Sequence, residues 1–186
     1  MDIFIEQIIV KKPDIPNILL KIALVAVTAV VCGIFLAAAI MFAGISFITV
    51  IALAAIPGVI WLGVHFFKSL IVEYEYILTN NELELDKITG KSRRKNMVTL
   101  NLQNAERFGI YSDNVSFNEF NADVTVSAHD NTRLNMWYLL VKDGTLGRVV
   151  VLFNPNDDFV IRLNKSLPLK VRNNTITERA RVKEWS

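Results

Sequence analysis

An unbroken stretch of uncharged residues limits what this chain can fold into more than any other feature. Residues 22–67, 46 in all, contain no Asp, Glu, Lys or Arg. A hydrocarbon core of roughly 30 Å is crossed by about 20 helical residues, so one helix of this length would be about twice as long as a bilayer needs. Two antiparallel crossings fit the same length. The sequence therefore predicts a transmembrane hairpin and excludes a fully soluble protein.

Small residues inside the stretch give the position of its turn. Gly44 and Ser46 interrupt the apolar pattern, which leaves spans from about Leu20 to Phe42 and from Phe47 to Phe67. A turn at Pro57 instead would leave only about nine residues before the next charged side chain, too few to cross. The turn is therefore predicted to be short and to lie next to Gly44.

Two rows of small residues recur at four-residue intervals in the spans. The rows are Ala29, Gly33 and Ala37 in the first span, and Ala54 and Gly58 in the second. Such rows allow close approach of helices, although alanine and glycine are common in membrane helices in any case. Both interpretations stay open at the level of sequence.

The end of the second span carries residues typical of a membrane interface. Trp61 and His65 precede Lys68, and aromatic rings and long cationic side chains favour headgroup depth. A proton relay through His65 is the alternative, but neither span contains a second ionisable group to pass a proton to. These three residues are therefore predicted to be interface anchors.

Lysines flank the hairpin on both sides and are absent from its turn. Lys11, Lys12 and Lys21 precede the uncharged stretch and Lys68 follows it. Because basic flanks favour the cytoplasmic side, the chain is predicted to be a multi-pass protein of the cell membrane with both termini in the cytoplasm.

Four parts are expected along the chain. Residues 1–18 form an interfacial helix and linker, since Phe4, Ile5, Ile8 and Ile9 lie on one helical stripe that prolines then end. The hairpin occupies 19–69, a β-rich domain 70–170, and a tail 171–186.

The β-rich domain shows period-two alternation with turn signals about every ten residues. This pattern predicts antiparallel strands and a C-terminal helix, with Asn154 as its N-cap and Pro155 in its first turn, that Pro168 ends. The seven strands are expected at 72–78, 82–88, 92–100, 106–112, 123–127, 134–141 and 148–153. Seven antiparallel strands closed by one helix predict a pleckstrin-homology-like (PH-like) barrel, an α+β domain.

The residues of the first two expected strands resemble those of a known protein family. The run Tyr76-Ile77-Leu78-Thr79, followed by Leu83 and then by Gly90, resembles the opening of bacterial PH-like domains, which begin with a tyrosine-rich strand after a transmembrane hairpin. The similarity spans about residues 60–168, and the whole chain resembles a family of small two-span membrane proteins of anaerobic Gram-positive bacteria. The resemblance implies fold and membrane attachment, and it implies no particular reaction.

Groups that could carry catalysis do not converge in the sequence. The only cysteine, Cys32, lies within the uncharged stretch, and the β-rich domain has one histidine, His129, at an expected surface turn. Asp157 and Asp158 lie at the expected N-terminus of the C-terminal helix, where the helix dipole favours acidic side chains without any catalytic role. The sequence predicts neither an enzyme nor a cofactor or metal site.

One cluster of basic residues stands out at the hairpin of the second and third expected strands. It contains Lys87, Lys91, Arg93, Arg94 and Lys95 with no acidic residue among them. Contact with anionic lipid headgroups is one interpretation. The alternative is a solvated hairpin whose charges pair with the acidic residues of 82–86. Nucleic acid is disfavoured, because residues 71–186 have a net charge of only +1 (16 basic minus 15 acidic).

The sequence thus predicts a membrane-anchored, non-enzymatic PH-like binding or scaffold protein. Its expected partners are the lipid bilayer, with anionic headgroups or a membrane protein as further candidates, and no nucleic acid. The alternative is an accessory or regulatory subunit of a larger membrane complex, which a stoichiometric partner in mild detergent would indicate.

Overall fold

The computed structural model describes residues 3–43, 46–111, 117–132 and 134–172. The chain divides into two compact units. One unit consists of the helical hairpin, residues 13–72, together with residues 89–91. The other consists of residues 1–12, 73–88 and 92–186, so the hairpin is an insertion within the second unit.

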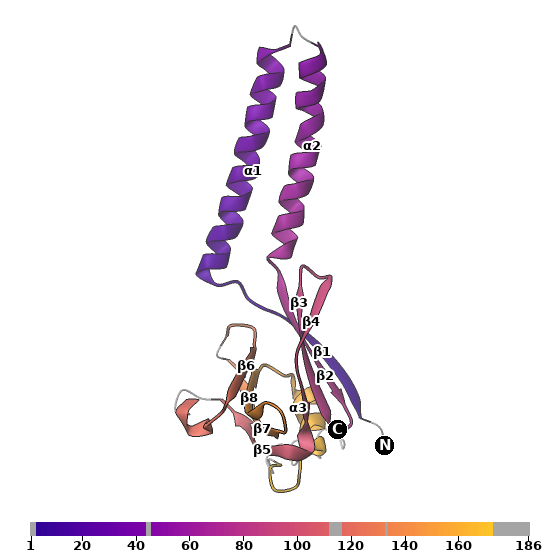
Figure 1. Ribbon diagram of the computed structural model, residues 1–186, viewed down its shortest axis with the longest axis vertical. Helices are drawn as coiled ribbons and strands as arrows, with labels where there is room; N and C mark the ends of the chain where they lie inside the picture. Colours follow the sequence, from indigo (N-terminus) through magenta and orange to yellow (C-terminus); the bar gives the residue numbers. More distant parts are fainter. Residues whose placement is uncertain (1–2, 44–45, 112–116, 133, 173–186) are drawn as a thin grey trace. The chain divides into compact units, whose positions relative to one another are not determined.

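Two long helices form the hairpin. Helix α1 runs from Ile15 to Met41 and helix α2 from Ser46 to Ser69, and the two lie side by side (Figure 1). Both are long and apolar enough to cross a membrane, and they fit the predicted transmembrane hairpin. The predicted turn falls between them, with its central residues 44–45 outside the described part of the chain.

The helices touch along a different face from the predicted rows of small residues. A Cβ atom on Gly63 would lie 2.8 Å from Oγ1 of Thr28, and Ala39 and Ala52 are buried. At Gly33 and Gly58 an added Cβ would meet nothing within 4 Å. The two glycines of the predicted rows, Gly33 and Gly58, therefore do not form the contact between α1 and α2.

The first sheet has four strands in the order β1-β2-β3-β4. Its strands are β1 (Phe4–Val10), β2 (Val72–Thr79), β3 (Glu82–Thr89) and β4 (Arg93–Asn101). Strands β2, β3 and β4 start within one residue of their predicted positions. The sequence predicted an interfacial helix at the residues of β1, and this prediction is wrong.

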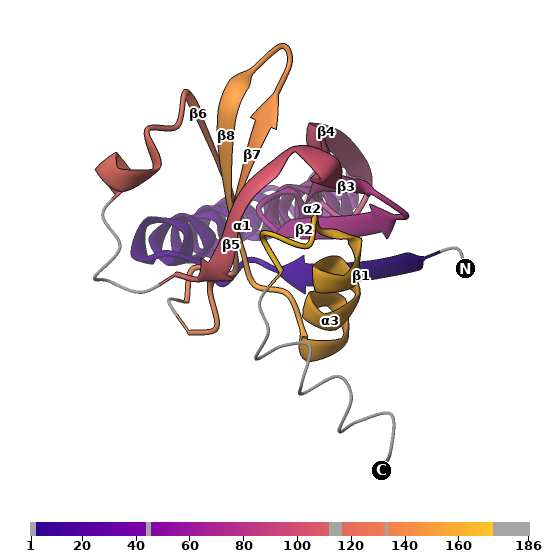
Figure 2. The same ribbon diagram turned by 90° about the horizontal axis from the view of Figure 1, so that it is seen from below.

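Strand β1 pairs antiparallel with β2 over its whole length, from Phe4 opposite Thr79 to Val10 opposite Glu73 (Figure 2). The strand is rich in β-branched residues, which fit a pleated surface. Its helical stripe was misleading because a short apolar run fits either period. The partner strand β2 follows the hairpin in the sequence, so no pattern within residues 4–10 predicts that they pair with it.

The second sheet has the order β5-β7-β8-β6. Its strands are β5 (Ala105–Ile110), β6 (Val124–Ala128), β7 (Trp137–Asp143) and β8 (Gly147–Phe153), and short 3-10 turns occupy Leu102–Asn104 and Phe117–Phe120. Strand β6 runs parallel to β8, against the all-antiparallel prediction. Within the described residues the two four-stranded sheets do not close into the predicted barrel.

Helix α3 (Asp157–Ser166) follows the second sheet, as predicted. Its N-cap is Asn156, whose side chain accepts a hydrogen bond from the Phe159 N–H, rather than the expected Asn154. Phe159 is fully buried and meets the ring of Tyr76 edge to face at 5.9 Å. The helix therefore contributes to the core that lies behind β2.

The β-rich domain is split in sequence, because the hairpin separates β1 from the other strands. A water-soluble version of this split domain, without the hairpin, tests the role of β1. Because Val10 lies opposite Glu73, a short Gly/Ser linker can join residue 12 to residue 72 in place of the hairpin. We expect this joined domain to unfold cooperatively in a denaturant titration monitored by circular dichroism. A chain of residues 71–172 alone should be clearly less stable, since the edge of β2 and the core beneath it are then exposed. Equal midpoints would contradict an integral β1.

Candidate functional site

The predicted basic cluster lies on the hairpin of β3 and β4. Its turn contains Gly90 at φ +63° and Lys91 at φ +60°. The Gly90 N–H donates to the Ile71 carbonyl at 2.9 Å, and a Cβ on Gly90 would lie 3.3 Å from Cα of Ser69. Glycine is favoured at residue 90 by its positive φ angle and by the close backbone of Ser69. The turn is therefore held against the end of α2.

Arg94 differs from the other cluster residues because it is part of an ion-pair network. Its Nη2 lies 2.7 Å from Oε1 and 2.6 Å from Oε2 of Glu75, a side chain that is 0% exposed. Only the contact to Oε1 has hydrogen-bond geometry, so Oε2 interacts as an ion pair. Arg94 also lies 3.7 Å from Asp86, which is nearly as buried.

The pKa of Glu75 is raised above its ordinary value. Burial is the main cause, followed by a side-chain hydrogen bond with Glu6. The positive charge of Arg94 acts in the opposite direction, while the negative charges of Glu6 and Asp86 add to the rise. Arg94 therefore compensates a carboxylate that the fold holds away from water.

Asn96 extends this network along β4. Its side-chain amide donates to Glu84 at 2.9 Å and to Asp86 at 3.0 Å. Arg94 and Asn96 thus place their side chains on the face of the sheet that carries Glu75. Arg94 thus pairs with Asp86, which belongs to the predicted acidic run, and more closely with Glu75, which lies outside that run.

The other cations of the cluster lie differently. Since side chains alternate along a strand, Arg93 and Lys95 are on the face opposite to Arg94. Lys87 is two residues after the buried Leu85 in β3, so the two share a face, and this is the face opposite to Arg94. Among the described residues, none forms an ion pair with Lys87, Lys91, Arg93 or Lys95. Four of the five predicted residues therefore keep their charge available.

The predicted interface anchors lie in the last three turns of α2. Trp61 stacks on His65 with ring centroids 5.6 Å apart, and Lys68 lies in the last turn. On the facing helix, Nζ of Lys21 lies 5.4 Å from the ring centre of Phe67. Aromatic and cationic side chains thus gather where both helices approach their ends.

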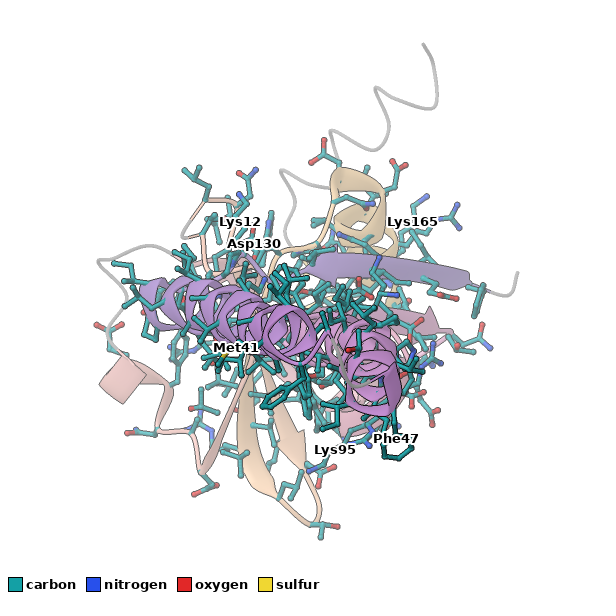
Figure 3. All side chains as sticks on the ribbon, turned by 90° about the horizontal axis from the view of Figure 1, so that it is seen from above. Lys12, Met41, Phe47, Lys95, Asp130 and Lys165 are labelled. Atoms are coloured by element: carbon teal, nitrogen blue, oxygen red, sulfur yellow. The ribbon has the colours of Figure 1, made fainter. Side chains whose placement is uncertain are left out.

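A second contact, absent from the sequence analysis, fixes the chain just before α1. The Lys12 N–H donates to the Asp130 carbonyl at 3.0 Å, and its Nζ lies 3.7 Å from the Asp130 carboxylate (Figure 3). Burial would raise the pKa of Asp130, but hydrogen bonds from Thr132 and the charge of Lys12 lower it below its ordinary value.

His129, which the sequence placed at a turn, makes a local contact of that kind. Its Nδ1 accepts a hydrogen bond from the Asn131 N–H, two residues later.

Groupings typical of metal sites are absent from the described residues. No set of three or more His, Cys, Asp or Glu side chains in the described ranges is placed to hold a metal ion. Asp157 and Asp158 lie in the first turn of α3, where the helix dipole favours them. The candidate site is the charged surface around the β3–β4 hairpin.

The Arg94–Glu75 pair makes a prediction about stability in the joined domain. We expect Arg94→Gln to lower the free energy of unfolding by about 1–3 kcal/mol near neutral pH, because a buried carboxylate loses its partner. Arg93→Gln, which removes the same charge one residue away, should change it by less than about 0.5 kcal/mol. Urea titrations measure both values.

The same variant has a predicted pH dependence. A raised pKa in the folded state means that Glu75 favours folding at low pH and loses that contribution as pH rises through the folded pKa. Without Arg94 the pKa rises further, so the penalty of Arg94→Gln should shrink as pH falls toward the ordinary range of a glutamate. A penalty that is unchanged in acid, or equal losses for both arginine variants, would contradict the ion pair.

Comparison with known proteins gives one finding. A family model described as "Bacterial PH-like domain (DUF6106)" matches residues 1–173. The match covers β1, the hairpin and both sheets, so the split arrangement lies within the region that the family model covers. No curated protein and no solved structure matches the chain.

Proposed function

Since the chain belongs to the bacterial PH-like domain family, we propose that it is a non-enzymatic binding or scaffold protein anchored in the cell membrane, with its PH-like domain in the cytoplasm. PH-like domains are generally non-catalytic. The observation that carries the proposal is the pairing of β1 with β2 across the membrane hairpin.

The pairing supports a common side for both ends of the hairpin. Strand β1 ends five residues before α1 begins, and β2 begins three residues after α2 ends. A ladder that joins these strands requires both to lie on one side of a bilayer. Two crossings return the chain to the side where it started, so hairpin and ladder fit each other.

The flanking charges support the cytoplasm as that side. Lys11, Lys12, Lys21 and Lys68 lie at the ends of the hairpin that carry the domain, and the turn has no basic residue. Positive charge next to short membrane segments favours cytoplasmic placement. The split domain would then fold in the cytoplasm, after both helices have been inserted.

The basic hairpin is proposed to contact anionic lipid headgroups. The turn residue Gly90 bonds to Ile71 just after α2, and Lys68 lies in the last turn of that helix. This proximity favours contact of Lys91 with the leaflet from which α2 emerges. Lys87, Arg93 and Lys95 are the further contacts, whereas Arg94 is engaged with Glu75. Arg94 is therefore withdrawn from the lipid-contacting set and assigned to support of the sheet.

The strength of this contact suits orientation rather than recruitment. Each basic residue near an anionic leaflet contributes about 1 kcal/mol, so four contribute roughly 4 kcal/mol before orientational costs. That corresponds to about millimolar affinity. Such a contact can align a domain that is already tethered, whereas it would hardly bring a free domain to the membrane.

The alternative of an accessory subunit remains a second candidate. The rows around Gly33 and Gly58 are free of intramolecular contact at these glycines, as a face for further helices would require. Purification in mild detergent distinguishes the two: a stoichiometric membrane partner favours a subunit, and a lone protein favours an independent anchor.

Membrane topology is tested with reporters at both termini of the full chain. We expect cytoplasmic activity for fusions before Met1 and after Ser186, because the β1–β2 ladder needs both hairpin ends on one side. A reporter active only in the cytoplasm, paired with one active only outside, gives the readout. One terminus on each side would overturn the proposal.

Lipid contact is tested by vesicle sedimentation of the joined domain. We expect binding to vesicles with anionic lipid at low salt, release as salt rises, and no binding to neutral vesicles. Changing Lys87, Lys91, Arg93 and Lys95 to Gln should abolish binding and leave the melting temperature within about two degrees.

A control with the same net charge accompanies this variant. It carries Gln in place of four exposed cations elsewhere, Arg107, Lys142, Arg162 and Lys170. We expect it to bind anionic vesicles nearly as well as the parent. Equal loss in both variants would mean that only net charge matters, and absence of binding by the parent would make the hairpin a solvated face.

A further inference from the structure

The outer face of the β1-β2-β3-β4 sheet is opposite to the core. Tyr76 of β2 is buried and contacts the rings of Phe153 and Phe159, so the residues that alternate with it point away from the core. The register of β1 on β2 adds the β1 side chains opposite them. We define this outer face by Phe4, Glu6, Ile8, Val10, Glu73, Glu75, Ile77, Glu82, Glu84, Asp86, Arg94 and Asn96.

Negative charge is concentrated on the outer face. Of the residues that define it, six are acidic and one, Arg94, is basic. Glu75 and Asp86 are buried and paired with Arg94, so the carboxylates that the face presents to a partner are those of Glu6, Glu73, Glu82 and Glu84. Residues 71–186, which contain all of these acidic residues except Glu6, are nearly balanced as a whole, with 16 basic and 15 acidic side chains. The imbalance therefore belongs to this face and not to the domain.

Large apolar side chains lie exposed among these carboxylates. Phe4 is 61% exposed, Ile8 52% and Val10 55%. Ile8 lies opposite Glu75 and Val10 opposite Glu73, so apolar and acidic positions adjoin across the two strands. Ile8 and Val10 are next to each other on this face, and exposed apolar side chains with charged residues around them are typical of a protein interaction site.

We propose that the outer face docks a basic segment of another protein, in which Lys or Arg side chains are interspersed with apolar ones. The apolar side chains would cover Phe4, Ile8 and Val10, and the cations would meet the neighbouring carboxylates. The charge disfavours the other occupants. Nucleic acid and an anionic leaflet carry the same sign as the face, and so does the outer face of a second copy of the chain.

This surface goes beyond the proposed lipid contact and is independent of it. Lys87, Arg93 and Lys95 point to the opposite side of the same sheet. One face of the sheet is then cationic at the end that carries the turn, and the other is acidic and apolar. A scaffold with two such faces can contact a membrane and a protein at once.

Peptide binding to the full chain in nanodiscs of phosphatidylcholine tests the proposal without anionic lipid. The probe is a short fluorescent peptide of alternating Lys and Val, measured by anisotropy against empty discs. We expect it to bind discs that carry the protein at least about tenfold more tightly than empty discs. Peptides of alternating Lys and Ser, and of Glu and Val, should each bind at least about tenfold more weakly, because one lacks apolar side chains and the other the matching charge.

Variants connect the binding to the outer face. Glu6, Glu82 and Glu84 changed together to Gln should weaken binding about tenfold, and so should Ile8→Thr, which keeps a β-branched residue in the strand. The matched control removes three acidic charges elsewhere, at Glu119, Asp157 and Asp158, and should bind like the parent. Unchanged far-ultraviolet circular dichroism checks that each variant keeps its fold.

Several results would overturn the proposal. These are binding no tighter than to empty discs, equal weakening by the control, and binding that the outer-face variants leave unchanged. Self-association of the protein that Ile8→Thr abolishes would also overturn it, since a second copy would then be the occupant. None of these results bears on vesicle binding by the basic hairpin, so the two proposals fail separately.

Discussion

The pairing of β1 with β2 is the interaction on which the rest of this structure depends. It joins residues that 61 others separate, Val10 and Val72 being the nearest ends, and everything between them is the hairpin and its short connections. Closing such a long loop costs conformational entropy, but two helices inserted as an antiparallel pair would already bring the strand ends together. Membrane insertion and domain folding would thus assist each other.

Two backbone hydrogen bonds fix the chain just before and just after the hairpin. Before α1, Lys12 bonds to Asp130 in the β-rich unit, and after α2, Ile71 bonds to Gly90 in the β3–β4 turn. Both contacts use backbone groups, so they fix the course of the chain without depending on a particular side chain. The Arg94–Glu75 pair adds a side-chain link between β4 and β2 and sorts the charges of the sheet between its two faces.

The sequence predicted the elements with local signatures and missed those that depend on distant partners. The uncharged stretch was sufficient for the hairpin, and alternation was sufficient for β2, β3 and β4. Strand β1 was missed because its apolar residues fit a helix as well, and its partner lies beyond the hairpin. The parallel pairing of β6 with β8 was missed for the same reason, because the residues of a strand do not determine the direction of its neighbour in the sheet. At the site, the cationic cluster was visible, but the engagement of Arg94 depends on Glu75, 19 residues earlier and on a different strand.

Disulfide trapping of β1 against β2 in native membranes tests the central claim most directly. Cysteines replace Glu6 and Ile77, which lie opposite each other, in a chain with Cys32→Ser. Mild oxidation of isolated membranes should form an intramolecular disulfide, because opposite residues in antiparallel strands have Cα atoms about 5 Å apart. The control pair Glu6→Cys with Glu73→Cys is offset by four residues, about 13 Å along the strand, and should stay reduced. Failure of the first pair to form a bond, or equal reaction of both pairs, would contradict a PH-like domain that is split by its membrane hairpin.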